Sequence, residues 1–187
     1  MDGTLLRVAE PRDAAGIEAL MKESTAAIFP RYYDERQTAS ALQHIAVVDP
    51  MLLADGTYFV VEHDGEIIAS GGWSRRDRLY NGSPISDGDA RLLDPAEEAA
   101  RVRAMYTRAG WTRRGLGRRI LEECERAALE HGFRRLELMA TLPGVPLYVA
   151  CGFPAGPHVE VTLPDGVALN GMPMAKPISV SIGSVRA

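Results

Sequence analysis

The sequence predicts an α/β fold of the α+β kind, formed by one domain. Residues 57–73 have the pattern of a β-hairpin, and residues 101–140 have the pattern of a strand, a helix and a second strand. No internal repeat or low-complexity tract interrupts this order. With 187 residues, of which 46% are hydrophobic and 25% charged, the chain is long and apolar enough to bury its own core.

Charge and cysteine content exclude several classes of protein. The chain carries 21 Lys and Arg against 25 Asp and Glu, a formal net charge of −4, which argues against a general nucleic-acid-binding protein. We find no apolar run of about 18 residues and no secretory pattern at the N-terminus, and therefore expect no membrane span. Cys124 and Cys151 are too few for a disulfide framework. We therefore expect a soluble, cytoplasmic protein in a reducing compartment.

The first fifty residues predict a strand and two helices. Residues 4–9 carry apolar side chains suited to a short strand. Pro11 suits the first turn of a helix, whose apolar stripe continues until Pro30 ends it. A second helix is expected to begin near Asp34 and to end at the Asp-Pro pair at 49–50.

A β-hairpin and a long polar loop follow. Residues 57–63 and 66–73 are strand-like, and the Asp-Gly pair at 64–65 between them is the preferred two-residue turn. Residues 74–98 form a long polar loop with two glycines and two prolines. Loops of this length are usually functional or mobile.

The second half predicts alternating strands and helices. Residues 101–107 alternate as a strand, and a helix follows Gly115, with an ion pair expected between Glu122 and Arg126 on its exposed face. Further elements are expected as a strand at 135–140, a short helix at 146–151 and a closing hairpin at 159–169. We assign residues 1–177 to the domain and residues 178–187 to a tail, which is an added edge strand, a partner contact or a frayed end.

The segment from Met105 to Arg118 carries the strongest chemical signal. Glycines at 115 and 117 let the backbone approach a ligand, and the first turn of the following helix adds free N–H donors and the positive end of a dipole. Four arginines lie close by and can pair with phosphates, namely Arg113, Arg114, Arg118 and Arg119. The segment thus predicts an anion site of the kind that holds a pyrophosphate, with a solvated basic surface as the alternative. It lacks the third glycine of the dinucleotide fingerprint and the lysine of the P-loop.

A second motif lies downstream. Thr112-Arg113-Arg114-Gly115-Leu116-Gly117 is followed, in order and spacing, by Leu147-Tyr148 to Gly152-Phe153, and together they resemble the paired motifs of the GNAT acetyltransferase superfamily. The resemblance covers at least residues 101–153. It implies the GNAT acyl-CoA acyltransferase fold, a mixed and mostly antiparallel sheet flanked by helices, with acetyl-CoA (coenzyme A) as co-substrate.

The resemblance also implies roles for individual residues. The strand before the loop would run along the pantetheine arm through backbone hydrogen bonds of Met105, Tyr106 and Thr107. The loop would wrap the pyrophosphate with Arg113, Arg114, Gly115, Leu116, Gly117 and Arg118. Tyr148 would protonate the leaving thiolate, since a phenol can donate a proton to a thiolate of comparable pKa. The alternative for Tyr148 is a half-buried aromatic residue that closes the core.

The sequence departs from the family pattern at three places. The first two loop positions are Thr112 and Arg113 instead of Arg or Gln and Gly, so only their backbone role carries over. The segment 141–144 lacks the asparagine often found there. The strand that often carries an acidic base reads Arg-Val-Arg at 101–103. Other candidate bases are Glu62, His63, His44 and Glu137, and a water relay or an amine that arrives neutral would also suffice.

The expected acceptor is a primary amine of a small molecule. The segment 29–33, the polar loop and Trp73 are its expected surroundings. Acidic residues of the loop would attract a cationic amine, namely Asp87, Asp89, Asp94, Glu97 and Glu98. Basic residues nearby would favour an acceptor with a carboxylate, namely Arg75, Arg76 and Arg78. Both kinds of acceptor stay open on the sequence.

Together, these implications describe an N-acetyltransferase in which a neutral amine attacks acetyl-CoA directly, in a V-shaped opening between the strands at 101–107 and 135–140. Direct attack agrees with a sequence that shows no Ser-His-Asp or Cys-His arrangement. The first alternative is a non-catalytic coenzyme A sensor on the same fold, and the second is a basic-loop nucleic-acid binder. We expect no metal and no nucleic-acid or membrane partner. Homodimers are common in the family, and the C-terminal strands are the expected contact.

Overall fold

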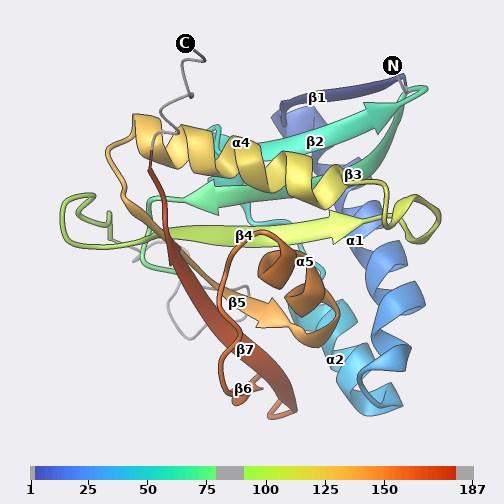
Figure 1. Cartoon of the computed structure of the whole chain (residues 1–187). Helices are drawn as coiled ribbons and strands as arrows, with labels where there is room; N and C mark the ends of the chain where they lie inside the picture. Colours follow the sequence, from blue (N-terminus) through green and yellow to red (C-terminus); the bar gives the residue numbers. More distant parts are fainter. Residues whose placement is uncertain (1–2, 79–90, 180–187) are drawn as a thin grey trace.

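The computed structural model describes residues 3–78 and 91–179. Its centre is a seven-stranded sheet in the order β1-β2-β3-β4-β5-β7-β6 (Figure 1). Neighbouring strands are antiparallel except β4 and β5, which are parallel. The strands are β1 Thr4–Val8, β2 Tyr58–His63, β3 Glu66–Ser74, β4 Ala100–Thr107, β5 Arg135–Thr141, β6 Val159–Thr162 and β7 Ala168–Pro177. The predicted mixed, mostly antiparallel sheet is thereby confirmed.

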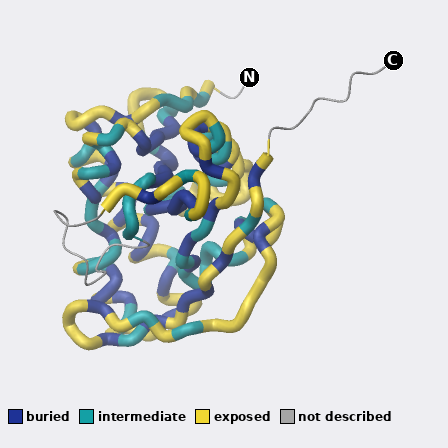
Figure 2. Tube along the Cα trace, turned by 90° about the vertical axis from the view of Figure 1, so that its left-hand side faces the viewer, coloured by how far each residue is buried: buried dark blue, intermediate teal, exposed yellow. Residues whose placement is uncertain are grey.

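Helices cover both faces of the sheet. The amphipathic helix α4 packs its buried side on one face, and α1 packs on the other (Figure 1). The helices are α1 Ala14–Ile28, α2 Glu35–His44, α3 Pro50–Ala54, α4 Leu116–Glu130 and α5 Val145–Ala150, with 3-10 turns η1 Pro11–Asp13, η2 Phe29–Arg31, η3 Ala109–Trp111 and η4 Leu142–Gly144. Figure 2 shows buried residues gathered between these layers and exposed ones on the outer turns. In the part of the chain that the structure describes, no helix is long and apolar enough to cross a membrane.

The Asp-Pro pair at 49–50 begins a helix instead of only ending one. Helix α2 ends at His44, and Asp49 caps α3 by accepting a 3.0 Å hydrogen bond from the N–H of Met51. The prediction that the second helix ends at this pair was wrong, because proline is tolerated in the first turn of a helix and Asp favours the position before it, so the pair starts a helix of its own.

Two further expectations need correction. Arg126 pairs with Glu123 and Glu130 on the exposed side of α4, and not with Glu122. Strand β7 extends to Pro177, much further than the expected hairpin, and pairs with β5 from Gly171 to Pro177. Its Gly and Pro residues resemble turn signals, but Met172 and Met174 alternate into the core and hold it as a strand.

The long loop and the tail are only partly described. The two ends of the loop pair with each other, since the N–H of Asp77 donates to Arg91 O at 3.0 Å and the N–H of Leu93 donates to Arg75 O at 2.8 Å. Residues 79–90, with Asp87 and Asp89, lie outside the described residues. Ile178 still belongs to the core, being 6% exposed, and the tail from residue 180 lies outside the described residues.

Candidate functional site

The parallel strands β4 and β5 separate soon after they begin. They pair at Ala100 with Leu136 and at Arg101 with Glu137, and no pair joins them beyond these two among the described residues. From Val102 onward, the edge of β4 that faces β5 therefore offers its backbone N–H and C=O groups to another partner. An extended molecule with amide groups can add to such an edge in the way that a peptide adds to a sheet.

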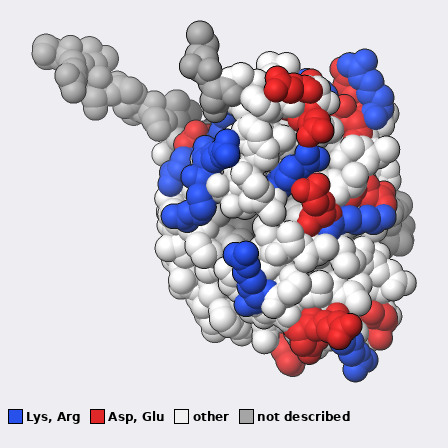
Figure 3. Space-filling model, turned by 90° about the vertical axis from the view of Figure 1, so that its right-hand side faces the viewer, with Lys and Arg blue, Asp and Glu red and all other residues white. Residues whose placement is uncertain are grey.

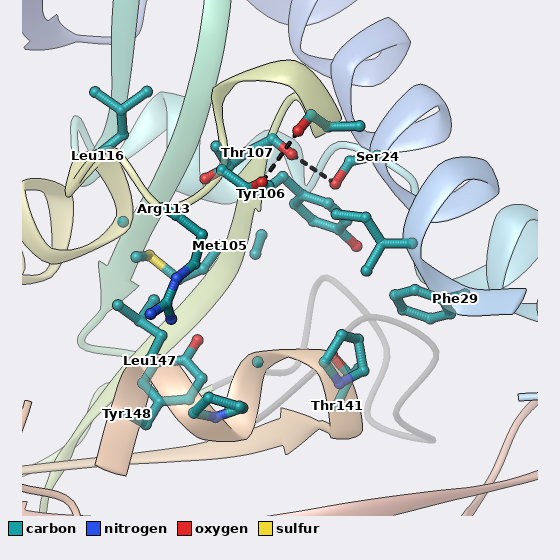
Figure 4. A pocket seen from close by; sticks show the side chains of 18 of the residues that line it. Ser24, Phe29, Met105, Tyr106, Thr107, Arg113, Leu116, Thr141, Leu147 and Tyr148 are labelled. Atoms are coloured by element: carbon teal, nitrogen blue, oxygen red, sulfur yellow. Dashed lines mark hydrogen bonds between the residues drawn. The ribbon is translucent and has the colours of Figure 1, made fainter. Parts of the chain in front are cut away.

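A cavity of about 720 Å³ occupies this opening. Its walls come from η2, β4, the β4–α4 loop, the start of α4, η4 and α5 (Figure 4). Eight of the nine predicted cofactor residues line it, together with Tyr148: Met105, Tyr106, Thr107, Arg113, Gly115, Leu116, Gly117 and Arg118. The ninth, Arg114, stacks on the ring of Trp111 with 4.5 Å between its Cζ and the ring centroid.

A β-bulge lies in β4 at the middle of the cavity. Ser70 pairs with Tyr106 and Gly72 pairs with Arg103, so that Ala104 and Met105 stand opposite Gly71 alone. Ala104 has φ of 51°, in the left-handed region that side-chain-bearing residues rarely adopt. A Cβ at Gly71 would collide with Sδ of Met105, so glycine makes room for the bulge.

The hydroxyl of Tyr58 holds this bulge from the α1 side of the sheet. It donates to the carbonyl oxygen of Ala104 at 2.7 Å and lies 3.1 Å from Oγ of Ser70. Tyr58 is 1% exposed, and burial raises the pKa of its phenol. At the end of β4, Oγ of Ser24 donates to Thr107 O at 2.9 Å (Figure 4). Two side chains thus fix the backbone of β4 along the cavity.

The start of α4 presents backbone donors to the cavity. No side chain caps this helix. The first backbone hydrogen bond of the helix runs from the N–H of Arg119 to the carbonyl oxygen of Gly115 at 3.0 Å. The backbone N–H groups at 116–118 therefore have no acceptor within the helix. Gly115 has φ of +82°, which glycine adopts without strain. Gly117 lies against α5, where a Cβ would be 2.9 Å from Cδ2 of Leu147. Such a helix start binds phosphate groups readily.

The arginines of the loop differ in their surroundings. Arg113 points into the cavity beside Met105, Leu147 and Tyr148 (Figure 4). Arg118 also lines the cavity, and its guanidinium donates to Ala150 O at 2.9 Å. Arg119 donates to Oγ1 of Thr4 at 3.0 Å and does not line the cavity.

Tyr148 lies on α5 across the cavity from β4. Its side chain is buried, with 7% of the residue exposed, and its ring makes an edge contact with Phe153 at 5.7 Å between centroids. The hydroxyl points into the cavity and makes no hydrogen bond within the described residues (Figure 4). Burial raises the pKa of this phenol above its ordinary value. The phenol therefore stays protonated at neutral pH and keeps its proton available for a leaving group.

The other end of the cavity has aromatic and aliphatic walls, which pack against α2 and the β6–β7 hairpin. Phe29, Tyr32 and Ile45 line this end, and the rings of Phe29 and Tyr33 lie 5.1 Å apart. The hydroxyl of Tyr33 donates to Asn170 O at 2.7 Å and accepts the N–H of Leu142 at 2.9 Å. This end is therefore a wall tied to the C-terminal strands.

None of the candidate bases lines the cavity in the described part of the chain. Glu62 pairs with Arg7 at 3.0 Å, His44 lies 3.5 Å from Asp165, and Glu137 pairs with Arg101. The ring of His63 contacts that of Trp111, with centroids 4.7 Å apart. Each of the four has a structural partner, and no group of three or more His, Cys, Asp or Glu among the described residues could hold a metal ion.

Arg103 belongs to the stretch of β4 in which an acidic base was looked for and not found. Arg103 lines the cavity, yet its side chain is 2% exposed and donates to Asp49 at 2.9 Å. Its guanidinium also donates to Arg78 O at 3.0 Å. The pair neutralises two buried charges and ties β4 to the start of α3.

Sequence reasoning missed Ser24, Tyr58 and the Asp49–Arg103 pair. Asp49 had a signal, since an Asp before Pro is a helix start as well as a break. Tyr58 and Ser24 had none, because each bonds a backbone carbonyl 46 and 83 residues away in the chain. Trp73, expected near the acceptor, is buried at 1% exposure in the α4-side core instead.

Comparison with known proteins agrees with this fold. The model of the Acetyltransferase (GNAT) family matches residues 17–153. A GCN5-related N-acetyltransferase structure from Rhodopseudomonas palustris is similar at a TM-score of 0.71 and 19% identity, covering 95% of this chain and 98% of that one. The PaiA N-acetyltransferase of Thermoplasma acidophilum, in complex with coenzyme A, is similar at 0.65 and 14%, covering 93% and 98%. The ribosomal-protein-alanine N-acetyltransferase of Brucella melitensis is similar at 0.61 and 17%, covering 93% and 99%. No curated protein sequence matches the chain.

Proposed function

We propose that this chain, which belongs to the Acetyltransferase (GNAT) family, transfers the acetyl group of acetyl-CoA to a primary amine of a small molecule. One observation carries the proposal. The open edge of β4, the uncapped start of α4 and the hydroxyl of Tyr148 all face a single cavity. These groups suit, in that order, an amide-bearing arm, a pyrophosphate and a leaving thiolate.

The residues present fit acetyl-CoA. Backbone groups of Met105 to Thr107 would bind the pantetheine arm, because this part of β4 lines the cavity without a partner strand on that side. The N–H groups at 116–118 and the guanidinium of Arg113 would bind the pyrophosphate. The bulge at Ala104 and Met105 turns the backbone of β4 out of its regular alternation, so a backbone N–H there can polarise the thioester carbonyl.

The transfer itself is a direct attack. The nitrogen of a neutral amine forms a bond to the thioester carbon, and the C–S bond breaks with its electron pair on sulfur. Tyr148 gives its proton to the thiolate and recovers one from water, while the acetylated nitrogen loses its extra proton to solvent. The four candidate bases all lie away from the cavity, which agrees with an acceptor that arrives already neutral.

The test is release of free thiol from acetyl-CoA in the presence of a panel of small primary amines. Turnover with at least one amine, reduced at least about 100-fold in kcat by Tyr148→Phe without loss of acetyl-CoA binding, supports the proposal. Binding of acetyl-CoA without turnover of any amine would instead support the non-catalytic sensor. The cytoplasmic location and the homodimer stay predictions.

A further inference from the structure

The end of the cavity opposite the pyrophosphate loop combines apolar walls with a positive charge. Phe29, Tyr32, Ile45 and Tyr106 supply the apolar and aromatic lining. Phe29 is 5% exposed and is held by Tyr33, whereas Tyr32 is 46% exposed and stands at the rim. A molecule that fills this end must therefore present an apolar body to a fixed wall.

The positive charge comes from Arg31, the last residue of η2. Its side chain is exposed and makes no ion pair or hydrogen bond within residues 3–78 and 91–179. Other arginines that the sequence offered for this purpose have partners: Arg76 binds Asp55 in a bidentate manner at 2.7 and 2.9 Å, and Arg75 lies 3.9 Å from the same carboxylate. The guanidinium N–H groups of Arg31 are therefore available to bind a ligand.

Among the described residues, the charged side chains that line the cavity are all arginines, namely Arg31, Arg103, Arg113 and Arg118. Figure 3 shows several basic side chains gathered on the left-hand part of one face of the molecule, whereas its right-hand part and lower edge carry basic and acidic side chains together. Of the acidic residues that favoured a cationic acceptor, the structure describes Asp94, Glu97 and Glu98. None of these three lines the cavity, and Glu98 forms an ion pair with Arg91. Arg103 is paired with Asp49, and Arg113 would bind the pyrophosphate, so Arg31 is the cavity arginine beside the aromatic wall that can attract an anionic acceptor.

We infer that the acceptor is a primary amine that also carries a carboxylate and an apolar side chain, as an aromatic or branched amino acid does. The inference rests on the proposed function and specifies its substrate class. The forked guanidinium of Arg31 binds the carboxylate through two parallel hydrogen bonds, and the aromatic wall takes the apolar body. The amine then faces β4, attacks the thioester carbon as described above and displaces the thiol of coenzyme A.

The test compares L-phenylalanine with L-phenylalaninamide as acceptors, with spermidine as the cationic alternative. The amine of L-phenylalaninamide is less basic than that of L-phenylalanine, so more of it is neutral and ready to react at a given pH. A preference for L-phenylalanine in spite of this difference therefore reports recognition of its carboxylate. We expect kcat/KM for the acid to exceed that for the amide by about 10- to 100-fold, as for one charge-assisted pair. Arg31→Gln abolishes this preference, and Arg31→Lys restores part of it.

Arg36→Gln is the matched control, because it removes the same charge from the exposed surface of the neighbouring helix α2 without touching the cavity. It should keep the preference. Equal use of acid and amide, retention of the preference in Arg31→Gln, or acetylation of spermidine in place of the acid would overturn the inference while leaving the proposed function intact. Binding of acetyl-CoA with no acetylation of the acid would overturn it as well. Failure of acetyl-CoA to bind would overturn the proposed function itself, and the titration that shows this is made first.

Discussion

The hydroxyl of Tyr58 donates a 2.7 Å hydrogen bond to the carbonyl oxygen of Ala104, the residue at which β4 leaves regular strand geometry. This bond crosses β3 on the α1 side of the sheet and joins β2 to β4. It fixes the direction of the peptide groups that would meet the thioester. A buried side chain outside the cavity thus sets the geometry of the strand inside it.

Tyr58→Phe should lower kcat about 10-fold and destabilise the protein by about 1–3 kcal/mol, because the Ala104 carbonyl is left buried without its donor. Steady-state kinetics and urea unfolding measure the two effects. Ser70→Ala is the control, since it removes the other neighbour of the Tyr58 hydroxyl and leaves the bond to Ala104 in place. If Tyr58→Phe kept the full kcat, the hydroxyl would not position β4.

Tyr148 should act as an acid over an unusually wide pH range. Burial raises its pKa above the ordinary value of about 10, so the phenol is still protonated where an exposed tyrosine has begun to ionise. The alkaline fall of kcat should therefore begin above about pH 10. A pH profile of kcat, with Tyr148→Phe for comparison, measures this. An alkaline limb near pH 8 in the wild type that vanishes in the variant would contradict the raised pKa.

A comparison of Gly115→Ala with Gly166→Ala distinguishes the effect of backbone strain on stability from the effect of the loop on acetyl-CoA binding. Gly115 and Gly166 have nearly the same φ, +82° and +81°, and no atom lies within 4 Å of a Cβ built on either. An alanine at either position should destabilise the protein by about 1 kcal/mol through the positive φ alone. Gly115→Ala should also weaken acetyl-CoA binding, whereas Gly166→Ala, in the β6–β7 turn, should not. Thermal unfolding and calorimetric titration measure the two properties, and equal acetyl-CoA affinities would count against the loop as the pyrophosphate site.

The buried ion pair of Arg103 and Asp49 should be costly to break. Asp49→Asn keeps an oxygen to cap α3 and removes the charge that faces Arg103, which should cost about 3–5 kcal/mol in urea unfolding. Asp34→Asn is the matched control, since Asp34 caps α2 on the surface, where Asn caps equally well. A cost for Asp49→Asn no larger than that for Asp34→Asn would mean that the charge of Asp49 does not stabilise Arg103.

The pair of Asp55 and Arg76 should contribute to stability in a pH-dependent way. The guanidinium of Arg76 lowers the pKa of Asp55, so the carboxylate stays ionised in the folded protein at pH values where it is protonated in the unfolded chain. The contribution is therefore complete above about pH 5 and is lost as the pH falls below about 4. Arg76→Gln should lower Tm at pH 7 and converge with the wild type near pH 2. Arg12→Gln, which breaks the exposed pair with Glu10, should change Tm little at either pH.

Local patterns were enough to predict most of the fold. The hairpin at 57–73, the strand before Arg108 and the amphipathic helix after Gly115 each carry a periodicity that only one element satisfies. Helix α3 and the full length of β7 were not predicted, since Pro50 and the Gly and Pro residues of 171–177 are turn signals that capping and pairing override. Whether Arg126 pairs with Glu123 or with Glu122 depends on side-chain rotamers, which the spacing along the helix does not determine.

The residues of the candidate site that belong to sequence motifs could be predicted. The residues whose role depends on contacts between distant parts of the chain could not. The loop at 112–117 and Tyr148 could be placed together because the two motifs resemble the paired motifs of one family, and the structure brings both to one cavity. The sequence analysis offered Arg75, Arg76 and Arg78 for a carboxylate and did not single out Arg31, because all are arginines near the expected cleft. Only their partners distinguish them: Asp55 occupies Arg75 and Arg76, and Arg31 faces the cavity.

The central claim is that the cavity between β4 and α5 binds acetyl-CoA, and calorimetric titration of acetyl-CoA into the purified protein tests it most directly. Gly117→Trp fills the cavity at the start of α4, where even a Cβ would be 2.9 Å from Leu147. Arg126→Trp places the same side chain on the exposed side of the same helix. We predict micromolar binding by the wild type and by Arg126→Trp, and none by Gly117→Trp. Absence of binding by the wild type, or unchanged binding by Gly117→Trp, would contradict the account.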